Sequence, residues 1–173
     1  MTKPIRIFAL CLAASLPIAL QAQQPANPMD NVPEIMPYDI PYGPPISLEK
    51  ADALINAAIA EAQKHHWKMN VAVVDSGANL VAFKRMNDAQ LASIQISEHK
   101  ARAAAKYRRE TKIFESAMQN GSTSIATLDD IVASRGGIPL VVEGKLIGAI
   151  GCSGGTGSQD EVACKAAVAL LAK

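Results

Sequence analysis

The 173-residue chain lacks a strong excess of charge of either sign. It carries 17 Lys and Arg against 16 Asp and Glu, a formal net charge of +1 at pH 7. Proteins that bind nucleic acid present a strongly basic face. The composition therefore predicts no nucleic-acid partner, and the length suffices for one domain with a buried core.

Motifs that bind cofactors or phosphate are also missing. The sequence has no H-E-x-x-H zinc motif, no paired C-x-x-C and no C-x-x-C-H for covalent haem attachment. It has neither the G-x-G-x-x-G dinucleotide pattern nor the Gly-Lys-Ser/Thr of a phosphate-binding loop. A haem group, if the protein binds one, must therefore be held noncovalently.

No apolar segment is long enough for a good membrane span, which needs about 20 apolar residues. The apolar stretch from Ile7 to Leu20 is interrupted by Pro17 and follows a short basic lead. Together with the sequence L-Q-A-Q, these features are typical of a secretory signal peptide cleaved after Ala22. We expect residues 1–22 to be removed and the mature protein to be periplasmic or secreted, without stable membrane insertion.

Cysteine is scarce in this chain. Of its three cysteines, Cys11 lies in the apolar core of the predicted signal, so the mature protein keeps only Cys152 and Cys164. The compartment to which the protein is exported permits disulfides. We expect the two cysteines to be linked, because the glycine-rich turn between them can bring them together.

Residues 23–45 form a proline-rich segment, with seven prolines among 23 residues. Proline fixes φ and lacks a backbone N–H, so the segment forms neither a helix nor a central strand. We expect an extended arm or linker that is either disordered or wrapped around a partner subunit, and its apolar residues favour the second. A small domain with an apolar arm has surface to cover, which predicts a homo-oligomer.

The rest of the chain alternates helical and strand patterns. Apolar residues at three- and four-residue steps predict a helix that begins after Ser47, a second over residues 89–108 and a last one from about Gln159 to Leu171. Apolar runs on either side of Asp75–Asn79, and others around Glu143–Gly144, predict two β-hairpins. Both hairpins are apolar almost throughout, which indicates strands covered on two faces. The expected fold is α+β, a three-layer α/β/α arrangement around an antiparallel sheet.

The connection between the second helix and the second hairpin predicts two further short helices, in T-K-I-F-E-S-A-M and I-A-T-L-D-D-I-V-A. The second helix itself has two distinct sides. Its predicted apolar side comprises Leu91, Ile94, Ala101 and Ala105. Its predicted polar side comprises Gln95, His99, Arg102 and Lys106.

His99 has two interpretations. A histidine flanked by charges on a polar helix side is often simply solvated. Alternatively, its imidazole is an axial ligand for a metal or haem iron, with Arg102 and Lys106 on the same side to meet the propionates. His65 and His66 end the first helix, where a cation suits the negative end of the helix dipole. His65 also falls near the apolar side of that helix and is a reserve ligand.

The stretch from Gly148 to Glu161, G-A-I-G-C-S-G-G-T-G-S-Q-D-E, is rich in glycine. It formally matches the G-x-S-x-G nucleophile motif around Ser153, but that fold needs its histidine after the serine and every histidine here precedes it. The simpler interpretation is a tight turn into a helix whose first residues are acidic. The alternative is a ligand pocket at the helix N-terminus. It would be formed by Ser153, Gly154, Gly155, Thr156 and Asp160.

Two blocks carry a family resemblance. G-G-I-P-L-V-V-E-G-K-L-I-G-A-I-G-C-S-G-G-T-G-S-Q-D-E-V-A-C, and A-V-V-D-S-G-A-N-L-V-A-F-K-R-M-N-D-A followed by H-K-A-R-A-A-A-K-Y, resemble the GlcG/HbpS family, which also supplies the C-terminal part of some cobalamin adenosyltransferases. The resemblance spans residues 46–173. It implies a profilin-like fold with a five-stranded antiparallel sheet between helices, a homo-oligomer, and haem or another small ligand held at a surface or between subunits.

Three functions follow from these observations. The first is an exported protein that binds haem b noncovalently, for capture, carriage or sensing, with His99, Arg102, Lys106 and His65 as the candidate site. The second is a periplasmic enzyme or accessory protein of small-molecule catabolism that uses Ser153, Asp160, Asp75 or His99 for acid/base chemistry. The third is an oligomeric assembly module.

Overall fold

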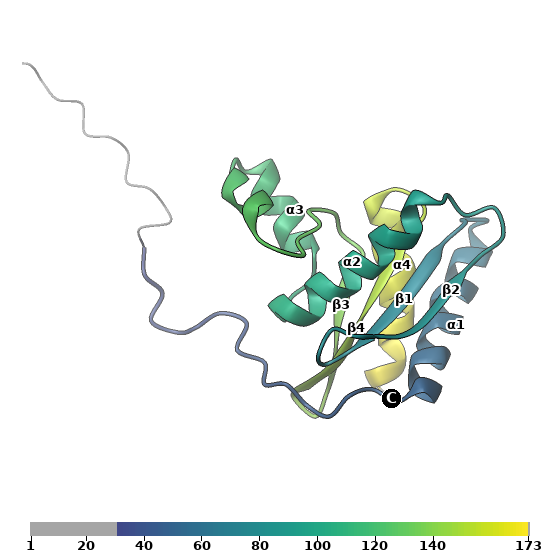
Figure 1. Cartoon of the computed structure of the whole chain (residues 1–173), viewed down its shortest axis with the longest axis horizontal. Helices are drawn as coiled ribbons and strands as arrows, with labels where there is room; N and C mark the ends of the chain where they lie inside the picture. Colours follow the sequence, from purple (N-terminus) through teal and green to yellow (C-terminus); the bar gives the residue numbers. More distant parts are fainter. Residues whose placement is uncertain (1–30, 173) are drawn as a thin grey trace, which may run out of the picture. The chain divides into compact units, whose positions relative to one another are not determined.

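The computed structural model describes residues 31–172, and the compact unit that carries the fold begins at Met36. The predicted signal peptide and the start of the proline-rich segment lie outside the described residues. A single antiparallel sheet, in the order β2-β1-β4-β3, forms the centre of this unit (Figure 1). Its strands are β1 (Asn70–Asp75), β2 (Leu80–Arg85), β3 (Gly137–Val142) and β4 (Lys145–Ser153).

Both predicted hairpins are confirmed, but the expectation of five strands is wrong for the described residues. β1 pairs with β2 and β3 with β4, and β1 and β4 join the two hairpins in the middle of the sheet. In place of a fifth strand, Tyr42 forms one isolated parallel bridge to Leu146. The prolines at positions 41, 44 and 45 lack the N–H groups that a longer ladder needs.

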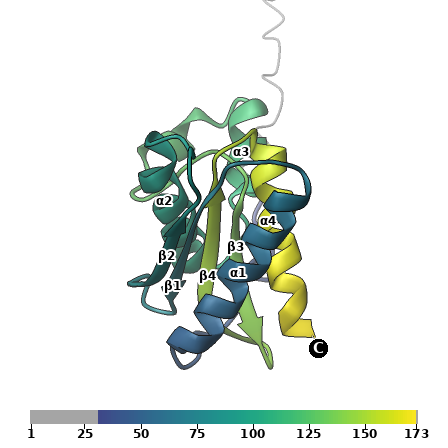
Figure 2. The same ribbon diagram turned by 90° about the vertical axis from the view of Figure 1, so that its right-hand side faces the viewer.

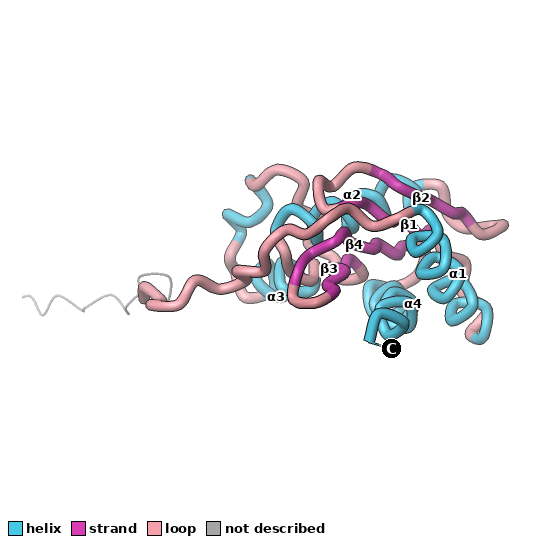
Figure 3. Tube along the Cα trace, turned by 90° about the horizontal axis from the view of Figure 1, so that it is seen from below, coloured by secondary structure: helices cyan, strands magenta, loops and turns pink. Residues whose placement is uncertain are grey.

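Helices cover both faces of the sheet. Helix α1 (Leu48–Lys64) and helix α4 (Gly157–Val168) pack against each other on one face, while α2 (Ala92–Tyr107) lies across β1, β3 and β4 on the other (Figures 2 and 3). Successive strand residues face opposite layers. Val71 and Val73 of β1 are buried with α1 and α4, whereas Ala72 and Val74 are buried with α2. This explains why the strands are apolar throughout.

The helix boundaries follow the sequence closely. Ser47 is the N-cap of α1, as predicted, and its Oγ accepts a hydrogen bond from the Lys50 N–H at 3.3 Å. Helix α3 (Lys112–Gln119) is also present, but residues 125–133 do not form the second short helix. That segment contains only the end of a 3-10 helix, Thr123–Thr127, and Asp130 has a left-handed φ of 60°, which a helix does not accommodate.

The apolar side of α2 differs from its prediction. Leu91 is 71 % exposed, so it does not belong to the core. The helix instead buries a small-residue side that also includes one lysine, at Ser93, Ser97, Lys100, Ala101, Ala103, Ala104 and Ala105. Small side chains let α2 approach the sheet closely, and the buried Lys100 is paired with Asp160 of α4.

The end of the proline-rich segment is fastened to its own chain. The Tyr42 hydroxyl donates to the Lys106 carbonyl at 3.0 Å, and the Gly43 N–H donates to the Leu146 carbonyl at 2.7 Å. Arg108 donates to the Ile40 carbonyl at 3.0 Å. Residues 40–43 therefore contribute to the fold of their own subunit, and contact of the arm with a partner subunit stays a prediction.

Candidate functional site

The polar side of α2 carries the predicted haem residues. His99 is exposed, and Arg102 and Lys106 follow on the same side of the helix. Arg102 donates to Glu98 at 3.1 Å, and the Lys106 ammonium is bonded to the Asp130 carboxylate. This hydrogen bond raises the pKa of Lys106 and lowers the pKa of Asp130. The structure thus brings the three residues together on one side of the helix, beside Asp130.

His65 lies elsewhere. It caps the C-terminal end of α1, where its ring stacks on Trp67 with centroids 4.3 Å apart and its Nε2 lies 3.4 Å from Glu61. Because α1 and α2 cover opposite faces of the sheet (Figure 2), a single chain does not combine His65 with His99. Among residues 31–172 there is also no cluster of three or more His, Cys, Asp or Glu side chains fit to hold a metal ion.

The glycine-rich turn is built as a structural connection between β4 and α4. Ser153 is buried, and Thr156 is the N-cap of α4 in a capping box with Gln159. Gly154 lies so close to the Lys68 carbonyl that a Cβ at this position would come within 2.0 Å of the oxygen. The Gly155 N–H donates to Asp160 at 3.0 Å. These contacts give Gly154, Gly155 and Thr156 each a role in the fold.

Asp160 is not an accessible acid. Its side chain is 3 % exposed and forms an ion pair of 2.7 Å with Lys100 of α2, whose side chain is 1 % exposed. The Lys100 ammonium also donates to the Cys152 carbonyl at 3.2 Å. Burial raises the pKa of the Asp160 carboxyl, while Lys100 and the amides of Gly155 and Gly154 oppose the rise. The pair ties α2, the end of β4 and the start of α4 together.

The other predicted acids have structural partners as well. Asp75 Oδ1 accepts from the N–H groups of Gly77 and Asn79, which fixes the turn between β1 and β2. Glu161 is buried; although burial raises the pKa of its carboxyl, the cations of Lys165, Lys112 and Arg135 hold that pKa below the usual value. The geometry therefore gives no support to an acid/base pocket at Asp75, Ser153 or Asp160.

The predicted disulfide is confirmed. The sulfur atoms of Cys152 and Cys164 are bonded, with their Cα atoms 5.8 Å apart. The bond joins the end of β4 to α4 across the glycine-rich turn, within the core between α1 and α4.

Replacing both cysteines by alanine should lower the free energy of unfolding by about 3 kcal/mol, since the bond restricts the unfolded chain across a separation of 12 residues. Urea denaturation without reductant measures this loss. Wild-type protein treated with reductant serves as the control and should unfold near the midpoint of the variant. Equal midpoints for oxidised and reduced wild type would contradict the prediction.

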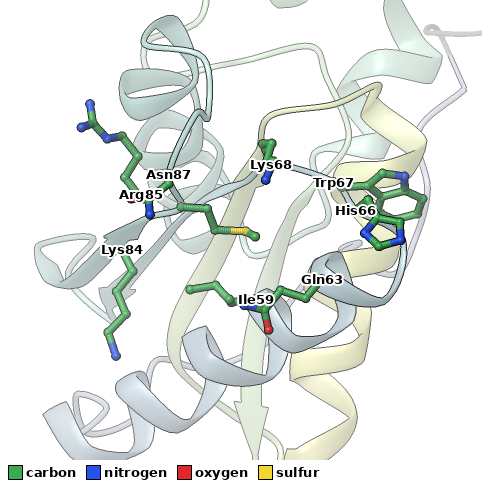
Figure 4. A pocket seen from close by; sticks show the side chains of 9 residues that line it. Ile59, Gln63, His66, Trp67, Lys68, Lys84, Arg85 and Asn87 are labelled. Atoms are coloured by element: carbon green, nitrogen blue, oxygen red, sulfur yellow. The ribbon is translucent and has the colours of Figure 1, made fainter.

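Sequence reasoning did not find the Lys100–Asp160 pair or a cavity of about 570 Å³ between α1 and β2. A signal for the pair existed, because Lys100 is one position from Ala101 on the small-residue side of α2. No local pattern pointed to the cavity. Its walls come from the last turns of α1 and from residues 84–87, which only the tertiary fold brings together (Figure 4).

The comparisons with known proteins agree with this fold. The model of the family described as "Haem degrading protein HbpS-like" matches residues 46–169. The chain belongs to the HbpS-like family. It is 46 % identical to Protein GlcG of Escherichia coli strain K12 over 128 residues, which cover 74 % of this chain and 96 % of that protein.

Two further relatives concern haem and corrinoids. The chain is 28 % identical to the corrinoid adenosyltransferase PduO of Citrobacter freundii over 73 % of this chain, but spans only 39 % of that enzyme. The crystal structure of a PduOC:haem complex is similar with a TM-score of 0.66 and 29 % identity, covering 72 % of this chain and 94 % of that one. The resemblance inferred from the sequence, including the link to the cobalamin enzymes, is therefore confirmed.

Proposed function

We propose that this HbpS-like protein binds haem noncovalently on the polar side of α2, with His99 toward the iron, and serves haem capture, carriage or sensing. The observation that carries the proposal is the placement of one exposed imidazole and two cations, Arg102 and Lys106, on one side of one helix. Membership of the HbpS-like family and the haem complex of a relative support it.

The donor set of α2 fits the group. Imidazole is a common axial ligand of haem iron. The guanidinium of Arg102 has five N–H donors, and Glu98 accepts from one of its nitrogens, so donors remain for a propionate. Lys106 is 51 % exposed beside Asp130 and has further N–H donors. When bound, the iron supplies the redox and ligand-binding chemistry; the chain's own residues bind and orient the group.

One side of a helix covers only one face of a flat group. The other face is then left to solvent or to a second copy of the chain, and a homo-oligomer that places a second subunit there shields the apolar ring from water. The proposal therefore includes a homo-oligomer with haem held near a contact between subunits. It also includes export to the periplasm after cleavage of residues 1–22.

Hemin should produce a saturable Soret change with the wild-type protein. His99→Ala should shift the Soret maximum and weaken binding, because the imidazole is lost from the iron. Arg102→Ala should weaken binding about tenfold with little spectral change, because it removes one charge-assisted contact to a carboxylate. His66→Ala is the control, since His66 is an exposed histidine at the end of α1.

The outcomes separate the site from the function. No saturable Soret change with wild type overturns the proposed function. Normal binding by His99→Ala, with loss in His65→Ala, moves the ligand to α1 while haem binding stands.

A further inference from the structure

The cavity beside α1 is a second candidate site, on the opposite side of the sheet from His99. It lies between the last turns of α1, the loop that leads into β1 and the end of β2 (Figure 4). Its apolar wall is formed by Ile59, Trp67 and Met86, and polar groups are supplied by Gln63, Lys68 and Asn87. The remaining lining residues, His66, Lys84 and Arg85, are also polar. The cavity therefore combines an apolar wall with charged and hydrogen-bonding groups, which suits an amphiphilic small molecule.

Of the three Lys and Arg side chains that line this cavity, Lys68 and Arg85 have no ion pair among the described residues. No acidic side chain lines the cavity. Lys84 is occupied by Asp52 and Asn56 of α1, each at 3.0 Å. The side chain of Arg85 extends away from the cavity (Figure 4). Lys68 remains, exposed at the cavity and without an ion pair in residues 31–172.

The backbone that carries Lys68 is firmly held. Gly154 of the glycine-rich turn packs directly on the Lys68 carbonyl, where no larger residue fits. The next residue, Met69, is buried, and its N–H donates to the Met86 sulfur at 3.3 Å. The glycine-rich turn therefore positions the wall of the cavity that carries Lys68. No side chain of the turn itself lines the cavity.

We propose that this cavity binds an amphiphilic monocarboxylate. The carboxylate pairs with the Lys68 ammonium, and the amides of Gln63 and Asn87 are further donors in the cavity wall. The apolar body lies along Ile59, Met86 and Trp67. Because the Arg85 side chain extends away, the Lys68 ammonium is the unpaired cation at the cavity, and it matches one negative charge. Haem carries two propionates, so this site is separate from the His99 site and does not depend on it.

Trp67 is the only tryptophan of the chain and lines the cavity, so its fluorescence reports occupancy directly. Octanoate should change the emission saturably. 1-Octanol, the neutral molecule of equal chain length, should bind at least about tenfold more weakly, because it lacks the charge-assisted bond. Equal affinities for octanoate and 1-octanol, or no saturable change with octanoate, would overturn the proposal.

Two matched pairs of variants test the wall residues. Lys68→Ala should weaken octanoate binding about tenfold and leave 1-octanol unchanged. Lys64→Ala should leave both unchanged, since Lys64 is paired with Glu61 at 2.6 Å. Ile59→Glu places a carboxylate in the wall and should abolish octanoate binding, whereas Ala60→Glu places the same charge on the exposed side of α1.

Circular dichroism establishes that each variant is folded before it is titrated. If Ile59→Glu does not fold, the comparison of Lys68→Ala with Lys64→Ala decides alone. Equal octanoate affinity in those two variants overturns the assignment of the carboxylate to Lys68.

Discussion

Replacing Lys100 with methionine is expected to lower the free energy of unfolding by about 3–5 kcal/mol near neutral pH. Methionine has a similar length and keeps the packing of α2, but it removes the cation that lies 2.7 Å from Asp160. The Asp160 carboxylate then remains buried with the Gly155 amide as its hydrogen-bond donor. Breaking a buried pair on one side is costly because the remaining charge is uncompensated. Urea denaturation of the oxidised protein measures the loss.

The loss should depend on pH in a defined direction. Burial raises the pKa of Asp160 above its ordinary value, and removing Lys100 takes away the main opposing influence. A carboxyl with a raised folded-state pKa contributes full stability below its unfolded pKa and loses it as pH rises through the folded pKa. The deficit of Lys100→Met should therefore be largest near neutral pH and should shrink toward about pH 4, near the ordinary pKa of an aspartate.

Two controls separate the pair from general effects. Lys106→Met lies on the same helix but removes an exposed ion pair with Asp130, so it should change stability little. Adding Asp160→Asn to Lys100→Met should restore much of the loss, because asparagine carries no charge and its side-chain oxygen can still accept from Gly155. A deficit in Lys100→Met that is unchanged by pH and by the second substitution would mean that packing, not charge, is responsible.

Most of the fold could be predicted from the sequence because, in the helices and hairpins, the local residue patterns favour the same structure as the tertiary packing. Ser47 caps α1, and the turns at Asp75–Asn79 and Glu143–Gly144 connect hairpins, as their residue types indicate. The number of strands was not predictable in this way. Whether a proline-rich segment joins a sheet depends on which of its backbone N–H groups are free to pair. Among the described residues of this segment, only Tyr42 forms a β-bridge, to Leu146.

The candidate site was predicted less completely than the fold. Helical periodicity correctly placed His99, Arg102 and Lys106 on one side of α2, because that relation is local. The glycine-rich stretch predicts Asp160 as a member of a ligand pocket, whereas in the structure it is the buried partner of a lysine 60 residues earlier in the chain. Long-range pairs of this kind leave little trace in a single sequence, apart from a lysine beside alanines on the small-residue side of a helix.

The closeness of α2 to the sheet leads to the second large effect. Gly151 of β4 lies beneath α2, where a Cβ would come within 2.0 Å of the Ser97 carbonyl oxygen and 2.6 Å of the Ala101 nitrogen. Both obstacles are backbone atoms of a helix packed across three strands, so neither can turn aside as a side chain does. Gly151→Ala therefore forces α2 away from β1 and β4 and loosens the core of small residues between them.

We expect Gly151→Ala to lower the free energy of unfolding by more than about 3 kcal/mol, at the severe end of overpacking, or to prevent folding. Gly155→Ala is the matched control in the same glycine-rich stretch. Its Cβ would meet only the side chain of Gln159, which can move at the expense of the capping box, at a cost of about 1 kcal/mol. Thermal and urea denaturation compare the two variants. Equal stabilities would show that α2 can shift on the sheet, and that the close contact at Gly151 does not fix the position of the helix that carries His99.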